Sequence, residues 1–213
     1  MLGAPIWAQT SPPFDFNAPP EIIVQPADVR ALPGQLDQVP MFNSNSPEWV
    51  KSEGILLSTL PPEGKQHPEA HLNYAFQGDF SLFAHHFSHT PPESKTLYVG
   101  ILLQNAGPET ATITIPAAAS FEMREAPFQE QPPIAENSDG SVYAGPGSRA
   151  VDAVMRGVRQ MDFPPEITLG PGQSVMLLNH GMPVRGLDRL VNGRSTFIRA
   201  NSDQPVYAAS LAM

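Results

Sequence analysis

The sequence contains no cysteine among its 213 residues. This absence excludes a disulfide framework, a thiolate nucleophile and a thiolate metal site. Any metal ion would have to use histidine, carboxylate or carbonyl ligands. Because a chain without cysteine suits an oxidising and a reducing compartment equally well, the cysteine count does not indicate where the protein resides.

Positive charge is scarce as well, and so are long hydrophobic runs. The 12 Lys and Arg residues are outnumbered by 21 Asp and Glu residues, which gives a formal net charge of −9. A nucleic-acid backbone or an anionic lipid surface repels such a chain, so we exclude nucleic acid as the main partner. No apolar run reaches the roughly 18 to 20 residues that cross a bilayer, and we expect no transmembrane segment.

Proline, in contrast, is abundant, with 25 residues, and glycine adds 16 more. These residues divide the chain into pieces too short for a helical bundle or a large parallel α/β array. Hydrophobic residues make up 41% of the sequence, which is enough for one core. The composition therefore predicts an all-β protein built from many short strands.

Strand-turn-strand patterns favour the same class. Three such units lie at residues 96–115, 166–178 and 195–211, each with turn-forming residues between two apolar or alternating segments. Residues 73–89 indicate a further strand pair around Gly78-Asp79. We predict an antiparallel, immunoglobulin-like β-sandwich with long Pro-rich loops.

One short helix is expected within this sandwich, at residues 148–160. Four apolar residues recur there at helical spacing: Val151, Val154, Met155 and Val158. Ser148 is suited to cap the first turn, because its hydroxyl can accept a hydrogen bond from a free backbone N–H.

The two ends of the chain suggest export. Residues 1–9, MLGAPIWAQ, resemble the last part of a signal peptide, and residues 10–40 form a Pro-rich extended arm. Residues 41–213 are expected to form a single β-sandwich domain. Since the last residues, PVYAASLAM, are strand-like and have no polar tail, we expect that domain to continue beyond residue 213. The predicted location is periplasmic or secreted.

Four of the six histidines lie close together in the sequence, at His71, His85, His86 and His89. Neutral imidazole is a common ligand of divalent metals, so these residues are candidate ligands, and Glu48 or Glu69 could act as a base beside the metal. On a regular strand, however, His85 and His86 point to opposite faces. The alternative is that these histidines are hydrogen-bonded structural residues.

A second candidate site is the segment Asn43 to Trp49. Asn43, Asn45 and Glu48 can bond the hydroxyl groups of a ligand, and the ring of Trp49 offers a face on which a sugar can stack. This combination suits a glycan. A tight turn stabilised by Asn and Ser side chains would produce the same pattern without a ligand.

A third candidate is electrostatic. All basic residues between positions 149 and 199 are arginines, and Arg149, Arg156 and Arg194 are candidates for an anion site or a contact between subunits. An ion pair between Arg149 or Arg156 and Asp152 within the helix is the simpler interpretation.

Nucleophilic catalysis has no support in the sequence, because GxSxG, GxGxxG and GxxxxGK[ST] motifs are all missing. No catalytic residue is therefore assigned.

Several short motifs resemble a cyanobacterial family of uncharacterised exported proteins, known as domain of unknown function 3370. They are Phe42–Glu48, Gly54–Thr59, Ala70–Asn73, the His85-His86 pair, Tyr143–Gly147, Asn192–Thr196 and Val206–Ala212. The resemblance implies export in a photosynthetic bacterium and brings no known reaction with it.

The function that we expect is therefore that of an exported, non-catalytic binding or structural protein of the cell envelope or extracellular matrix. An envelope component or polysaccharide, or a second copy of the chain, would be its partner. The alternatives are a metal-dependent hydrolase, which would need a divalent metal at the histidines, and a glycan-binding module.

Overall fold

The computed structural model describes residues 38–88, 96–126, 143–182 and 193–213. All of these residues belong to one compact unit, Asp37–Met213. The signal-peptide remnant predicted at residues 1–9, nearly all of the arm predicted at residues 10–40, and His89 lie outside the described residues.

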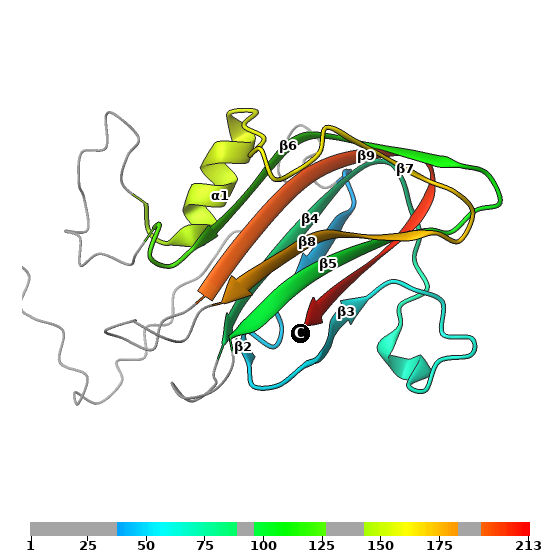
Figure 1. Ribbon diagram of the computed structural model, residues 1–213, viewed down its shortest axis with the longest axis horizontal. Coiled ribbons are helices and arrows are strands. Elements are labelled where there is room, and N and C mark those ends of the chain that lie inside the picture. The colour runs from blue at the N-terminus through cyan, green and yellow to red at the C-terminus, as the bar shows by residue number, and fades with distance from the viewer. Residues whose placement is uncertain (1–37, 89–95, 127–142, 183–192) are drawn as a thin grey trace, which may run out of the picture. The chain divides into compact units, whose positions relative to one another are not determined.

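The described residues form nine strands and one α-helix (Figure 1). The strands are β1 (Met41–Ser44), β2 (Trp49–Val50), β3 (Gly54–Ser58), β4 (Phe76–Ser88), β5 (Leu97–Asn105), β6 (Ala111–Glu122), β7 (Glu166–Leu169), β8 (Ser174–Met182) and β9 (Gly193–Ala212). The helix is α1 (Pro146–Met155), and a short 3-10 helix, η1, covers Pro68–Ala70. The predicted all-β class with one short helix is confirmed.

Strand β9 is the central strand of the sheet. It has 20 residues, and its two parts pair with different strands. Its first part pairs antiparallel with β4 on one side and β6 on the other. Its last part pairs antiparallel with β3 and β5. We call the region of β1, β2, β4, β6, β7 and the first part of β9 the first half-sheet. The second half-sheet consists of β3, β5, β8 and the last part of β9 (Figure 1).

The sheet is mixed rather than purely antiparallel. Strands β1 and β2 run parallel to β4. The pairings of β5 with β8 and of β6 with β7 are antiparallel, as expected. The immunoglobulin-like arrangement of two separate sheets stays a prediction, since hydrogen bonds connect all nine described strands through β9.

The core combines buried side chains of both half-sheets. Phe80 and Leu82 of β4 belong to the same buried cluster as Ile101 and Leu103 of β5. A second, smaller cluster lies on the other face of the first half-sheet, where Ala150 and Val154 of α1 pack against β6 and β9 residues such as Phe121 and Phe197. The first half-sheet is therefore covered on both faces.

Helix α1 begins two residues earlier and ends five residues earlier than predicted. Gly145 takes the N-cap position and Pro146 starts the helix, where a missing N–H costs nothing. The Ser148 hydroxyl donates to the carbonyl oxygen of Gly145 instead of capping an N–H, so the capping prediction was wrong. The helix ends before Gly157, whose φ is +75°, and the residues after it bond to β6.

The predicted strand-turn-strand units contain strands, but these strands do not pair with each other. Strand β5 pairs with β8 and β9, whereas β6 pairs with β7 and β9. Residues 195–211 lie in one long strand, β9, and the predicted pair at 73–89 is the single strand β4 with a register shift at Phe76–Gly78. The hairpin predictions were wrong because turn residues indicate a change of direction without indicating which strand becomes the neighbour. Here the chain passes from one half-sheet to the other at these turns.

Candidate functional site

The inner face of the first half-sheet changes from apolar to polar toward the beginning of β9. Three rows of paired residues show the change: Ile198 lies between Leu82 and Ala118, Thr196 between Ala84 and Ser120, and Arg194 between His86 and Glu122. Paired residues on neighbouring strands have their side chains on the same face. One end of the interior is therefore lined by groups that can bond a polar ligand.

Arg194 is the centre of this polar end, and its side chain is only 13% exposed. Its Nε donates to the carbonyl oxygen of Gly181 at 2.9 Å, and its Nη1 donates to Ser120 Oγ at 3.1 Å. Its Nη2 lies 3.8 Å from Glu122 Oε2. Burial lowers the pKa of Arg194, while the carboxylates of Glu122, Glu125 and Asp162 raise it. The guanidinium is thus held in one orientation between β9, β6 and β8.

An acid and a histidine face each other beside Arg194. Asp162 Oδ2 lies 3.0 Å from His180 Nε2, and the imidazole packs edge-on against the buried ring of Phe163. Among the described residues, His180 Nδ1 is buried and has no hydrogen-bond partner. Burial and the charge of Arg194 lower the pKa of His180, and Asp162 raises it.

The segment after α1 positions Asp162 by pairing with β6. Gln160 donates from its backbone N–H to the carbonyl oxygen of Ala118. Its side-chain amide accepts from the Ser120 N–H at 2.7 Å and donates to the Ser120 carbonyl oxygen at 3.3 Å. These bonds fix residues 160–162 along the edge of the first half-sheet.

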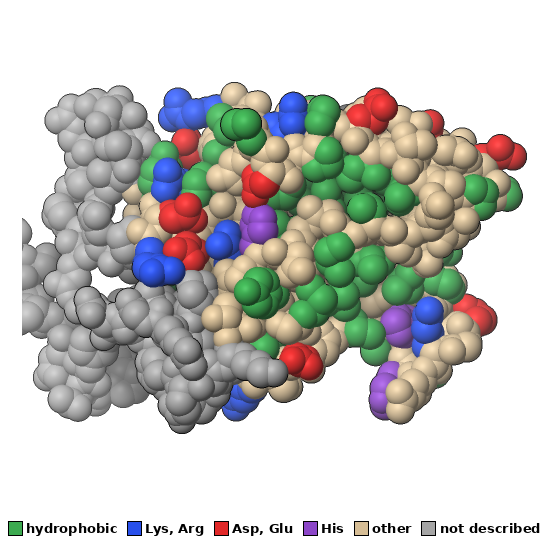
Figure 2. All heavy atoms as spheres, in the orientation of Figure 1, with side chains coloured by type: hydrophobic (Ala, Val, Ile, Leu, Met, Phe, Trp, Pro, Cys, Tyr) green, Lys and Arg blue, Asp and Glu red, His purple; other side chains and the backbone are tan. Residues whose placement is uncertain are grey.

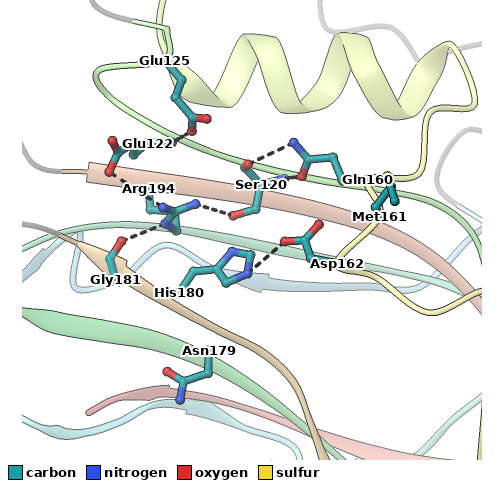
Figure 3. Close-up of a pocket in the computed structure, with 10 residues that line it drawn as sticks. All are labelled: Ser120, Glu122, Glu125, Gln160, Met161, Asp162, Asn179, His180, Gly181 and Arg194. Carbon is teal, nitrogen blue, oxygen red and sulfur yellow. Dashed lines mark hydrogen bonds and ion pairs between the residues drawn. The ribbon is translucent and has the colours of Figure 1, made fainter.

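These residues surround an open pocket with a volume of about 630 Å³ (Figure 3). Its lining consists of Ser120, Glu122, Glu125, Gln160, Met161, Asp162, Asn179, His180, Gly181 and Arg194. Figure 3 shows that Asn179 points away from the other side chains, on the opposite side of β8 from His180. Figure 2 shows side chains of both charges and a histidine side by side on this face. We call this the polar pocket.

The charges of the polar pocket are unequal. Its lining has three carboxylates, Glu122, Glu125 and Asp162, and one arginine. Glu122 also accepts from the exposed Arg124 at 3.0 Å. The pocket is therefore polar and acidic, with a mixture of fixed donors and acceptors.

A second groove, of about 540 Å³, differs in chemistry. It lies between β1 and β3 and is lined mainly by apolar and aromatic residues: Pro40, Met41, Phe42, Asn43, Leu57, Thr59, Leu72, Tyr74 and Phe76. We call it the apolar groove. It provides far fewer polar groups than the polar pocket does.

The structure gives each of the three described candidate histidines a hydrogen-bonding role of its own. His71 Nδ1 bonds Ser58 Oγ at 2.8 Å. His85 lies between Ser195 Oγ, at 2.6 Å from Nδ1, and Glu48 Oε1, at 3.5 Å from Nε2. His86 is fully buried.

The two ring nitrogens of His86 bond Ser44 Oγ at 2.9 Å and the Pro47 carbonyl oxygen at 2.8 Å. In the described part of the chain, no group of three or more His, Asp or Glu residues could hold a metal ion.

The residues of the predicted glycan site are divided between surfaces. Asn43 lines the apolar groove, whereas Trp49 lines a separate hollow with Glu53 and Ile55. Asn45 is exposed, and Glu48 pairs with His85. The segment thus does not converge on one pocket.

The three candidate arginines are also separated. Arg149 and Arg156 lie on α1 beside a hollow of about 360 Å³. Arg149 covers the ring of Phe121 at 4.2 Å, and Arg156 pairs with Asp152 at 2.9 Å as the helical spacing suggested. Arg194 alone belongs to the polar pocket.

The sequence analysis did not identify Asp162, His180, Asn179 or Gln160. The sequence contained one signal: the polar residues Asn179 and His180 directly follow the apolar segment that was predicted to end at residue 178. Polar residues that continue a buried strand indicate a polar end of the core. Their convergence with Asp162, however, depends on the packing of the segment after α1.

The comparisons with known proteins identify one family. The family model described as a protein of unknown function, DUF3370, matches residues 27–213. The chain belongs to the DUF3370 family. The match includes all nine described strands, α1 and the polar pocket.

Neither a curated protein nor a solved structure matches this DUF3370 chain. Within the described ranges, no helix is both long and apolar enough to cross a membrane.

Proposed function

We propose that this DUF3370 protein is an exported, non-catalytic binding protein of the cell envelope or extracellular matrix, and that its polar pocket binds a neutral saccharide. The observation that carries this proposal is the convergence of Arg194, Asp162, His180 and Gln160 around one open pocket at the polar end of the interior. These groups come from β9, β8 and the segment after α1.

A saccharide fits the chemistry of this lining. Each sugar hydroxyl donates one hydrogen bond and accepts others, so a saccharide site needs donors and acceptors side by side. Guanidinium, carboxylate and amide groups supply both in fixed planes, and their bonds to hydroxyls are charge-assisted where the group is ionised. Arg194 and Asp162 are each held by a neighbouring residue, which preorganises them for such contacts.

Other ligand classes fit less well. Three carboxylates against one arginine disfavour a phosphate or a carboxylate ligand. An apolar ligand would leave the buried parts of these polar groups without partners, which costs free energy. A neutral hydroxyl-rich ligand avoids both costs.

Export and location belong to the same proposal. They are supported by the signal-like residues 1–9, and a saccharide ligand is abundant in an envelope or matrix. Self-association of the chain is a further expectation, which sedimentation of the purified protein would test.

Isothermal titration calorimetry with two neutral series, β-1,4-linked glucose oligomers and N-acetylglucosamine oligomers, tests the binding proposal. We expect one series to bind and Asp162→Asn to weaken binding about tenfold, because a charge-assisted hydrogen bond contributes about 1.5 kcal/mol. Asp152→Asn on α1 is the matched control, since it makes the same change outside the polar pocket.

A second pair of variants distinguishes the polar pocket from the segment first suspected of glycan binding. Asn43→Ala and Trp49→Ala should leave binding unchanged, whereas Asp162→Asn weakens it. Wild-type protein that binds neither series would refute the proposal. Loss of binding in Asn43→Ala and Trp49→Ala with full binding in Asp162→Asn would move the site to the other segment.

A further inference from the structure

An exposed aromatic ring lies at the rim of the polar pocket, on the outer face of the second half-sheet. Tyr98 of β5 is 44% exposed and pairs directly with Gly181 of β8, which lines the pocket. A Cβ placed on Gly181 would lie 3.3 Å from Thr96 Cγ2 and 3.6 Å from Tyr98 Cε1, so both side chains lean across the backbone of β8. Because Gly181 has no side chain, the Tyr98 ring can lie at the edge of the pocket.

The next pair on the same face adds an amide. Gly100 of β5 pairs with Asn179 of β8, and Asn179 is exposed and lines the polar pocket. Residues 179 and 181 share one face of the strand, because side chains alternate along it. The Tyr98 ring and the Asn179 amide therefore lie on the same side of β8, with one glycine beside each of them.

The surroundings of this pair are apolar. A Cβ on Gly100 would meet the side chains of Met176 and Met213, which therefore cover that glycine. Met176 is 37% exposed. Figure 2 shows hydrophobic side chains gathered over β5 and β8, next to the charged side chains of the polar pocket.

We propose that Tyr98 and Asn179 form a second saccharide subsite, which binds the sugar unit next to the one in the polar pocket. This inference rests on the proposed function. The apolar face of a pyranose ring stacks on an aromatic ring, and an adjacent amide bonds its hydroxyls. A chain of two or more sugar units can pass from one subsite to the other along the edge of β8, past Gly181, which has no side chain of its own and lies beside the Tyr98 ring. The ligand class is therefore an oligosaccharide rather than a monosaccharide.

The test compares ligand length in wild-type protein and in Tyr98→Ala, with calorimetry on the glucose and N-acetylglucosamine series from one to six units. We expect the wild type to bind the longer oligomers more tightly than the monomer. Tyr98→Ala should bind the longer oligomers about tenfold more weakly while its affinity for the monomer stays unchanged. Tyr98→Phe keeps the ring and should restore the dependence on length, which shows that stacking rather than folding is measured.

Tyr74→Ala is the matched control, because Tyr74 is 46% exposed and lines the apolar groove. Tyr98→Ala with wild-type affinity for every length would overturn the second subsite, and the proposed function would stand if Asp162→Asn still weakened binding. Wild-type protein that binds no member of either series would overturn both.

Discussion

The guanidinium of Arg194 in β9 donates from Nε to the carbonyl oxygen of Gly181 in β8 at 2.9 Å. Strand β8 pairs with β5, and the bond from Arg194 lies on its other edge. The bond therefore satisfies a backbone acceptor at a strand edge and connects the two half-sheets directly. The polar pocket exists where this connection replaces apolar packing.

Removal of that connection should be costly. Arg194→Met leaves the Gly181 carbonyl without its side-chain donor and removes the bond to Ser120 Oγ, which keeps its bond to Thr196 Oγ1. We expect a loss of about 2 to 3 kcal/mol in the free energy of unfolding, measured by urea denaturation. Arg156→Met is the control. Its side chain is 65% exposed, and the loss there should not exceed about 0.5 kcal/mol. Equal losses in the two variants would contradict the role of Arg194.

His86 should make the stability depend on pH. Burial lowers the pKa of His86 from its usual 6.5, as it does for His85 and His180. Because the unfolded chain then binds protons more readily than the folded one, stability is complete above pH 6.5 and falls as the pH drops below that value. One such group contributes up to about 1.4 kcal/mol per pH unit.

Urea denaturation at pH 7.5 and pH 5.5 measures this effect. We expect the free energy of unfolding of the wild type to be lower at pH 5.5. His86→Gln should lose about 1 kcal/mol less than the wild type between the two values, because one of the three depressed histidines is gone. A variant with the full acid sensitivity of the wild type would show that the neighbouring histidines cause it.

Asn105 stabilises the crossing between the half-sheets. Its Nδ2 donates to the carbonyl oxygens of Glu109 and Leu169, at 2.7 and 2.9 Å, and its Oδ1 accepts from the Gly107 N–H. Asn105→Asp keeps the shape but replaces the donor by a carboxylate facing two carbonyls. We expect a loss of about 3 kcal/mol or more, measured by thermal and urea unfolding. Gln104→Ala, which removes an exposed bond to Gly172, should change stability by about 0.5 kcal/mol at most.

Helix α1 should be held by its buried face. Val154 is fully buried against β6 and β9, whereas Val151 on the same helix is 40% exposed. Val154→Ala should cost about 1.5 to 3 kcal/mol in urea denaturation, and Val151→Ala less than about 0.5 kcal/mol. Similar costs for both variants would mean that the helix does not pack as described.

The sequence predicted the strand segments far better than their pairing. The turn at residues 106–109 and the turn at residues 170–173 are both real, but neither joins two paired strands. Alternation of apolar residues indicates that one face of a strand is buried. The pattern is the same whichever strand becomes its neighbour in the sheet. Asn105 and Leu169, far apart in the sequence, meet at the crossing, and no local pattern encodes that contact.

For the candidate site, too, the sequence indicated residue types but not which residues meet. The histidines drew attention because they are close in sequence, yet His71, His85 and His86 each bond different partners. The pocket residues Asp162 and His180 are 3.0 Å apart only because the segment after α1 pairs with β6. Proximity in sequence was therefore a poor guide to proximity in space.

The sequence by itself determined the all-β class, the helix near residue 150, the absence of thiol chemistry and the family membership suggested by its motifs. Each of these follows from composition or from a pattern within a short segment. Composition and local patterns can be read without knowing which segments of the chain meet in space. Tertiary structure decided the course of β9 through both half-sheets, the crossings at the turns, and the polar pocket around Arg194. These features depend on contacts between residues far apart in the sequence, and such contacts form together when the whole core is buried.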